Sequence, residues 1–170
     1  MLDAANQTTG GHTMKKILLA LICSAGTLLF ADTDLRVQKF SPPVKGSAQV
    51  VSTGWKNYGL KLAATPDSDA EVIYNQLFRF YPGMFYKVSG DFSGTGEIFV
   101  KMYFYNLDGT PYKVPVKDAV IRLEKDEFDA RFDLREFTAA DAPRRYKVVV
   151  GVKKGGSIIL EDLELEVDDD

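Results

Sequence analysis

Histidine and cysteine are almost missing from this sequence, and both occur only near its start. The 170 residues contain one histidine, His12, and one cysteine, Cys23. After Cys23 the chain therefore has no imidazole and no thiolate. This excludes disulfides, Ser-His-Asp and Cys-His nucleophilic sites, and metal sites built on imidazole or thiolate ligands. The chemistry that remains rests on carboxylates, either a catalytic pair of acids or an oxygen-ligated calcium ion.

Basic residues do not outnumber acidic ones. The chain has 21 lysines and arginines against 24 aspartates and glutamates, which gives a formal net charge of −3. Proteins that bind nucleic acid present a basic face to the phosphates, and anionic lipid surfaces attract the same kind of face. We therefore expect neither nucleic acid nor an anionic membrane surface as a partner.

One apolar run stands near the N-terminus. Residues 17–30 are apolar apart from a few small residues, and Lys15 and Lys16 precede them. Ala31 follows the run, and the next residues are polar and acidic. A short positive segment, an apolar stretch and a small residue at the cleavage point are typical of a secretory signal peptide. The stretch is short for a membrane span, so we expect none in the mature chain.

This pattern predicts three parts of the chain. Residues 1–13 are expected to be an unstructured upstream extension, residues 14–31 a signal peptide, and residues 32–170 a single exported domain with an acidic C-terminal tail. The destination is left open between periplasm, cell surface and extracellular space. Cys23 follows Ile22, whereas lipid attachment to a cysteine calls for a small residue there, so a lipid anchor is not expected.

The remaining chain has the residue pattern that is typical of an all-β protein. Short runs rich in Val, Ile, Phe and Tyr alternate with Gly, Pro, Asn and Asp, and no segment shows a convincing helical period. About nine or ten short strands predict a two-sheet antiparallel β-sandwich of the jelly-roll type. The expected strands are residues 35–40, 48–52, 58–63, 70–80, 85–92, 97–105, 120–123, 128–134, 146–152 and 158–167.

Strict alternation in residues 97–105 separates a core row from a row of aromatic and basic residues. Ile98, Val100, Met102 and Phe104 are expected to face the core. The side chains between them then face water, and an exposed stripe of that kind needs an explanation. Its members are Phe99, Lys101, Tyr103 and Tyr105.

The order of several short motifs resembles one family, the jelly-roll carbohydrate-binding modules with a galactose-binding-like fold, including those attached to xylanases and glucanases. The motifs are a Gly-centred strand, a Gln followed by alternating apolar residues and Pro-Gly, a Tyr…Ser strand, an aromatic strand ending in Asp-Gly, and a last strand with an acidic pair. They lie at residues 56–62, 76–83, 86–90, 103–109 and 155–163.

The resemblance implies a secreted, non-catalytic domain whose partner is a polysaccharide or another glycan. Such a domain stacks sugar rings on aromatic side chains of one sheet or its edge loops. We therefore expect no enzyme, and we expect ligand contacts at Trp55, Tyr58, Tyr74, Phe99, Lys101, Tyr103 and Tyr105.

Two other readings stay open at this point. In the family an opening segment helps to build a structural calcium site, and residues 37–40 do not match it, although Asp162 of the closing acidic pair is present. A structural calcium ion at Asp162 is thus an alternative, with no other cofactor expected. The second alternative is a structural or adaptor β-sandwich of the cell envelope that binds a protein partner, because the chain has a single tryptophan and no catalytic signature.

Overall fold

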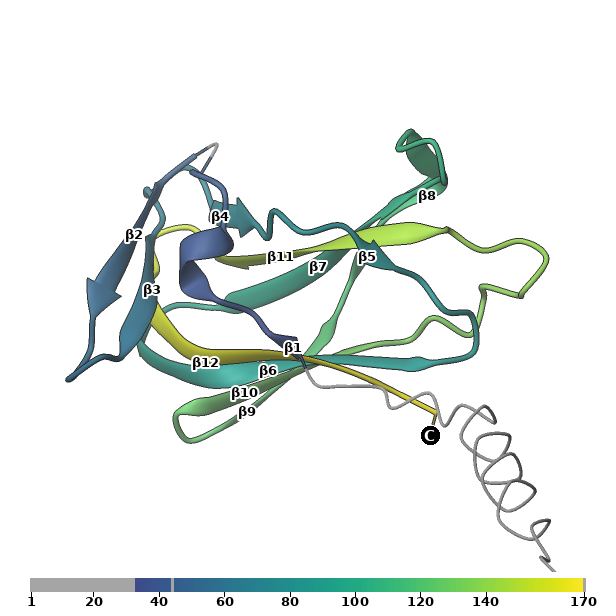
Figure 1. The fold of residues 1–170 in the computed structure, drawn as a ribbon. Helices are drawn as coiled ribbons and strands as arrows, with labels where there is room; N and C mark the ends of the chain where they lie inside the picture. Colours follow the sequence, from purple (N-terminus) through teal and green to yellow (C-terminus); the bar gives the residue numbers. More distant parts are fainter. Residues whose placement is uncertain (1–32, 44, 170) are drawn as a thin grey trace, which may run out of the picture. The chain divides into compact units, whose positions relative to one another are not determined.

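The computed structural model describes residues 33–43 and 45–169. The predicted signal peptide at residues 14–31 and the extension at residues 1–13 lie outside the described residues. The described part contains twelve β-strands and one turn of 3-10 helix, η1 (Val37–Lys39), and no α-helix. The strands form two antiparallel sheets that face each other (Figure 1). The predicted all-β sandwich is thereby confirmed.

One sheet has seven strands. Its neighbours follow the order β2, β3, β12, β6, β10, β9, and β1 pairs with the far part of β12. Their bounds are β1 (Thr33–Asp34), β2 (Ser47–Ser52), β3 (Tyr58–Ala63), β6 (Phe85–Thr95), β9 (Val120–Glu124), β10 (Glu127–Phe132) and β12 (Ser157–Asp168). The β2–β3 hairpin and the β9–β10 hairpin therefore form opposite edges of this sheet.

The other sheet has five strands. Its order is β4, β11, β7, β8, and β5 pairs with the early part of β11. The bounds are β4 (Ala70–Ile73), β5 (Phe78–Arg79), β7 (Ile98–Tyr105), β8 (Pro111–Asp118) and β11 (Arg145–Val152). β7 and β11 pair along their whole length, from Ile98 opposite Val152 to Tyr105 opposite Arg145.

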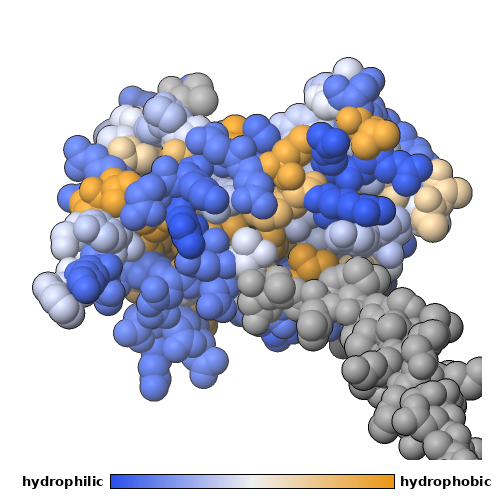
Figure 2. Space-filling view, in the orientation of Figure 1, coloured by the Kyte–Doolittle hydropathy of each residue, from blue (hydrophilic) through white to orange (hydrophobic). Residues whose placement is uncertain are grey.

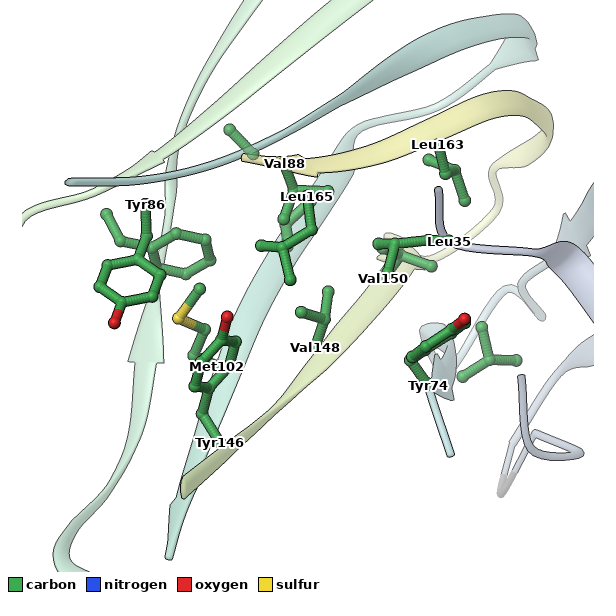
Figure 3. Close-up of a cluster of buried hydrophobic side chains, with 14 of the residues drawn as sticks. Leu35, Tyr74, Tyr86, Val88, Met102, Tyr146, Val148, Val150, Leu163 and Leu165 are labelled. Atoms are coloured by element: carbon green, nitrogen blue, oxygen red, sulfur yellow. The ribbon is translucent and has the colours of Figure 1, made fainter. Parts of the chain in front are cut away.

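The core lies between the inner faces of the two sheets. Val88 and Leu165 of the seven-stranded sheet meet Met102, Val148 and Val150 of the five-stranded sheet (Figure 3). All five side chains are at most 1 % exposed. Burial of these alternating rows, which removes apolar surface from water, holds the two sheets together.

Two strand predictions need correction, and one strand was not predicted. Residues 35–40 form the 3-10 turn η1 and a single bridge from Phe40 to Tyr74, since the two prolines that follow prevent regular pairing. Residues 70–80 break into β4 and β5, two separate pairings with β11. The sequence reading also missed β8, an edge strand whose Pro111 and Pro115 hid its strand character.

Candidate functional site

Trp55 stands at the tip of the β2–β3 hairpin. The turn is closed by two backbone hydrogen bonds, from Thr53 N to the Asn57 carbonyl oxygen at 3.2 Å and from Asn57 N to the Gly54 carbonyl oxygen at 3.4 Å. Lys56 adopts φ of +66°, a left-handed conformation that reverses the chain directly after Trp55. The indole is held away from the core as a result, and Trp55 is 88 % exposed. The Lys56 ammonium lies 4.5 Å from the indole centroid.

Tyr58 follows this turn as the first residue of β3, and its side chain lies outside the core. It shares the face of Leu60 and Leu62, which are buried, yet Tyr58 is 53 % exposed. Val50 of β2 is also 46 % exposed, and the space-filling view shows hydrophobic surface over this end of the sandwich among hydrophilic surface (Figure 2). The hairpin thus presents an indole, a phenol ring and an aliphatic side chain to solvent.

A polar hollow of about 180 Å³ opens beside the hairpin, and we name it the turn-side hollow. Thr53 and Asn57, which flank the tip on either side of Trp55 and Lys56, line it together with Tyr58. Its remaining polar lining combines hydrogen-bond donors with acceptors. These residues are Asp34, Arg36, Gln38, Lys56, Glu161 and Asp162. Sugar hydroxyls both donate and accept hydrogen bonds, so this lining matches their chemistry.

Asp162, the predicted calcium ligand, lies in the turn-side hollow. It stands at a bulge where the pairing of β12 with β6 slips between Glu161 and Glu164, and its φ of +45° reflects that irregularity. Within residues 33–43 and 45–169, no three acidic, histidine or cysteine side chains are placed to hold a metal ion. Calcium is held by several converging oxygens, backbone carbonyls among them, and a calcium ion at Asp162 stays a prediction.

Phe99 is covered although it lies on the outer face of the five-stranded sheet. Its side chain is only 7 % exposed. The ammonium groups of Lys101 and Lys153 lie 4.5 Å and 4.7 Å from its ring centroid. This contradicts the expectation of an open stacking ring, because a side chain buried to this extent leaves no free ring face for a sugar.

Two further members of the predicted stripe, Lys101 and Tyr103, are engaged in polar contacts. Lys101 Nζ lies 3.5 Å from one carboxylate oxygen of Glu71, and the Tyr103 hydroxyl donates to the other at 3.5 Å. Partial burial, followed by the Glu71 charge, raises the pKa of Tyr103 above its usual value. Tyr105 is half-buried opposite Arg145. The stripe is thus a packed and mostly satisfied surface.

Tyr74 belongs to the core. It is 1 % exposed, and its ring lies 5.0 Å from that of Phe40 and 5.8 Å from that of Phe78, centroid to centroid. Burial raises the pKa of its phenol. Tyr74 therefore cannot stack on a ligand in this conformation, and its assignment as a ligand contact is wrong. Alternation carried the signal, since Ala70, Val72 and Tyr74 share one face and all three are buried.

The sequence reading missed the residues that line the turn-side hollow together with Tyr58. Asp34 and Arg36 come from the segment before η1, and Glu161 comes from the other end of the chain. Nothing in their local sequence marks them, since only the pairing of β12 with β3 and β1 brings them beside the hairpin.

No protein-family model and no curated protein matches this sequence. Among solved structures, the CBM22-1 xylan-binding domain of Xyn10C from Paenibacillus barcinonensis matches with a TM-score of 0.53 and 5 % identity, over 83 % of this chain and 95 % of that domain. The enzymatically active domain of tailspike protein 4 from bacteriophage CBA120 matches with a TM-score of 0.51 and 11 % identity, over 78 % of this chain and 20 % of that chain. This protein therefore spans about a fifth of the tailspike chain.

A family 30 carbohydrate-binding module also matches, with a TM-score of 0.48 and 14 % identity, over 85 % of this chain and 92 % of the module. The described residues contain no helix with the length and apolar character needed to cross a bilayer. At these identities the comparisons concern the fold alone. The likeness to the CBM22-1 domain confirms the resemblance predicted from the motifs: the chain has the jelly-roll sandwich fold found in carbohydrate-binding modules.

Proposed function

We propose that this protein is an exported, non-catalytic module that binds a glycan at the tip of the β2–β3 hairpin. The observation that carries the proposal is the 88 % exposure of Trp55 beside a polar hollow. An exposed indole offers a flat apolar face to the C–H groups of a sugar ring. Exposure of this apolar surface to water is unfavourable, so a ligand that covers it gains binding free energy. Tyr58 supplies a second ring next to the same hollow.

The lining of the turn-side hollow completes this picture. Carboxylates of Asp34 and Asp162 accept hydrogen bonds from sugar hydroxyls, and the amides of Gln38 and Asn57 donate or accept them. Stacking supplies affinity, while polar groups of this kind fix the orientation and identity of the ligand.

The state of two carboxylates favours a non-catalytic role. Asp129 and Asp133 lie on one face of β10 and its extension, the arrangement a catalytic pair would need, but each is bound by an arginine. Arg131 bonds Asp129 at 2.8 Å and Arg135 bonds Asp133 at 2.5 Å. The hydrogen bond from Arg135 lowers the pKa of Asp133 to about 2. A general acid needs a raised pKa, so Asp133 is unsuited to that role.

Trp55 is the single tryptophan of the chain, and this makes the direct test simple. Titration of the protein with neutral oligosaccharides, xylo- and cello-oligosaccharides among them, should change the intensity or wavelength of tryptophan emission in a saturable way. Stacking replaces water around the indole, and emission responds to that replacement. Because only one indole reports, any saturable change locates the ligand at the hairpin tip.

A calorimetric comparison of two variants supplies the control. Trp55→Ala should abolish the heat of binding. Leu107→Ala, which removes a 69 % exposed side chain from a different hairpin loop, should leave it unchanged. If no glycan in the panel alters the emission, the proposal is wrong. A protein partner captured by the wild-type chain and lost by Trp55→Ala would then favour an adaptor of the cell envelope.

A further inference from the structure

A second hollow lies at the opposite edge of the seven-stranded sheet. It has a volume of about 490 Å³ and shares no residue with the turn-side hollow. Pockets for small ligands span roughly 300–1,000 Å³, so its size is sufficient for a sugar ring. We name it the arginine hollow, after three of its lining residues. The residues used below are Phe85, Val120, Arg122, Arg131, Asp133 and Arg135.

Positive charge gathers in the arginine hollow of a protein that is acidic as a whole. Three arginines and one aspartate contribute to the lining, and no glutamate or lysine does. The whole chain carries −3. A concave site lined mainly by one sign of charge attracts ligands of the other sign, which here means anions.

Arg122 is the arginine whose charge is available. Arg131 is bound to Asp129 and Arg135 to Asp133. Arg122 faces Asp129 across the β9–β10 pair, yet the Oδ1 atom of Asp129 is buried without a hydrogen-bond partner, so Arg122 does not reach it. Among the described side chains, none forms an ion pair with Arg122. A guanidinium with open donors binds a carboxylate through two parallel hydrogen bonds.

The same hollow has an apolar wall. Phe85 is the first residue of β6, and the Arg131 guanidinium lies 5.7 Å from the centroid of the Phe85 ring. Val120 of the edge strand β9 is 66 % exposed at the hollow. An aromatic ring and an aliphatic side chain beside a free guanidinium fit a ligand that has both an apolar ring face and an anionic group.

We infer that the arginine hollow binds an acidic sugar residue, a pyranose that carries a carboxylate. Its C–H face packs against Phe85 and Val120, and its carboxylate pairs with Arg122. The preference for an anion rests on the hollow itself, whereas the choice of a sugar as its carrier rests on the proposed function.

Calorimetry with trigalacturonate and its methyl ester tests the inference, because esterification removes the charge of each carboxylate and adds only a methyl group to it. The acid should bind and the ester should bind at least about ten-fold more weakly, the loss expected for one charge-assisted contact. Arg122→Gln should weaken binding of the acid by a similar factor. Arg145→Gln, an exposed arginine on the other sheet, should change it little. Added salt should weaken binding of the acid.

Equal binding of acid and ester, or equal affinity of Arg122→Gln and Arg145→Gln, would overturn the inference. Competition by inorganic phosphate at the same concentration as trigalacturonate would also overturn it, since the hollow would then recognise charge without a sugar. The tryptophan titration with neutral oligosaccharides separates this failure from failure at the hairpin tip. Trp55→Ala should lose the neutral ligands and retain trigalacturonate, while Arg122→Gln should do the reverse.

Discussion

The ring of Phe99 lies across Gly151, its partner on the neighbouring strand of the five-stranded sheet. The two residues face each other in the β7–β11 register, and a Cβ added at Gly151 would overlap the ring atom Cζ. It would also stand 2.6 Å from the carbonyl oxygen of Ala70. The missing side chain at Gly151 is what lets the Phe99 ring approach the neighbouring strand so closely, and the ammonium groups of Lys101 and Lys153 lie over the ring.

Gly151→Ala should therefore destabilise the protein by about 1–3 kcal/mol, the usual cost of forcing atoms into a packed site. Urea unfolding followed by circular dichroism measures the change. Gly54→Ala is the control, because its added Cβ would meet nothing closer than 3.9 Å, and its effect should stay within about 0.5 kcal/mol.

A double-mutant cycle measures how much of the destabilisation by Gly151→Ala arises from the overlap with the Phe99 ring. In the Phe99→Ala background Gly151→Ala should cost less than in the wild type, since only the contact with the Ala70 carbonyl remains. An unchanged cost in the two backgrounds would mean that the ring does not rest on Gly151.

Two of the aromatic residues that the sequence analysis grouped as ligand contacts should differ sharply in their effect on stability. Tyr74→Ala removes a ring that is 1 % exposed and should cost about 3–5 kcal/mol. Trp55→Ala removes a ring that is 88 % exposed and should change the free energy of unfolding by at most about 0.5 kcal/mol. Thermal or urea unfolding of both variants measures this, and a costly Trp55→Ala would show that the indole packs against the domain.

Alternation predicted which side of each strand faces the core, but not how open the other side is. Ile98, Val100, Met102 and Phe104 are all buried as expected, because period 2 is a property of the strand itself. The closure of Phe99 depends on Gly151, more than fifty positions later in the chain. Only the strand register reveals that partner, and the register between strands so far apart in the chain could not be predicted from the sequence.

The same limit applies to the candidate site. Trp55 was identifiable because a lone tryptophan next to a glycine in a turn signals an exposed ring. The hollow beside it combines Asp34, Asn57 and Glu161, which come from three distant segments. The arginine hollow had no sequence signal either, since Arg122 and Arg131 meet through the β9–β10 hairpin and Phe85 joins them from β6.

The loop before β6 is fixed by one tyrosine. The Tyr86 hydroxyl accepts a hydrogen bond from Tyr81 N at 2.7 Å and donates one to the Tyr81 carbonyl oxygen at 3.1 Å. Tyr86→Phe removes both bonds and keeps the ring stacked on Phe80. We expect a loss of about 1–3 kcal/mol in the free energy of unfolding. Hydrogen exchange at Tyr81 should accelerate more than exchange in β7, and uniform acceleration would argue against a local role.

Alkaline pH should destabilise the fold through two core tyrosines. Burial raises the pKa of Tyr146 and of Tyr86 far above the ordinary value of 10.0. Their rings lie 5.4 Å apart, centroid to centroid, between the two sheets (Figure 3). Below pH 10 both tyrosines are protonated in the folded and unfolded states alike. Above pH 10 the unfolded chain releases these protons and the folded chain retains them, so the unfolded state is favoured.

Each of these two tyrosines then lowers the free energy of unfolding by up to about 1.4 kcal/mol per pH unit above pH 10. Urea unfolding at intervals between pH 8 and pH 11.5 measures the slope. Tyr146→Phe keeps the ring and removes the titrating group. Its free energy of unfolding should therefore fall less steeply with pH in this range than that of the wild type, by the contribution of one tyrosine. Parallel slopes would mean that Tyr146 ionises as readily in the folded protein as in the unfolded chain, which its burial between Phe78, Phe80 and Tyr86 argues against.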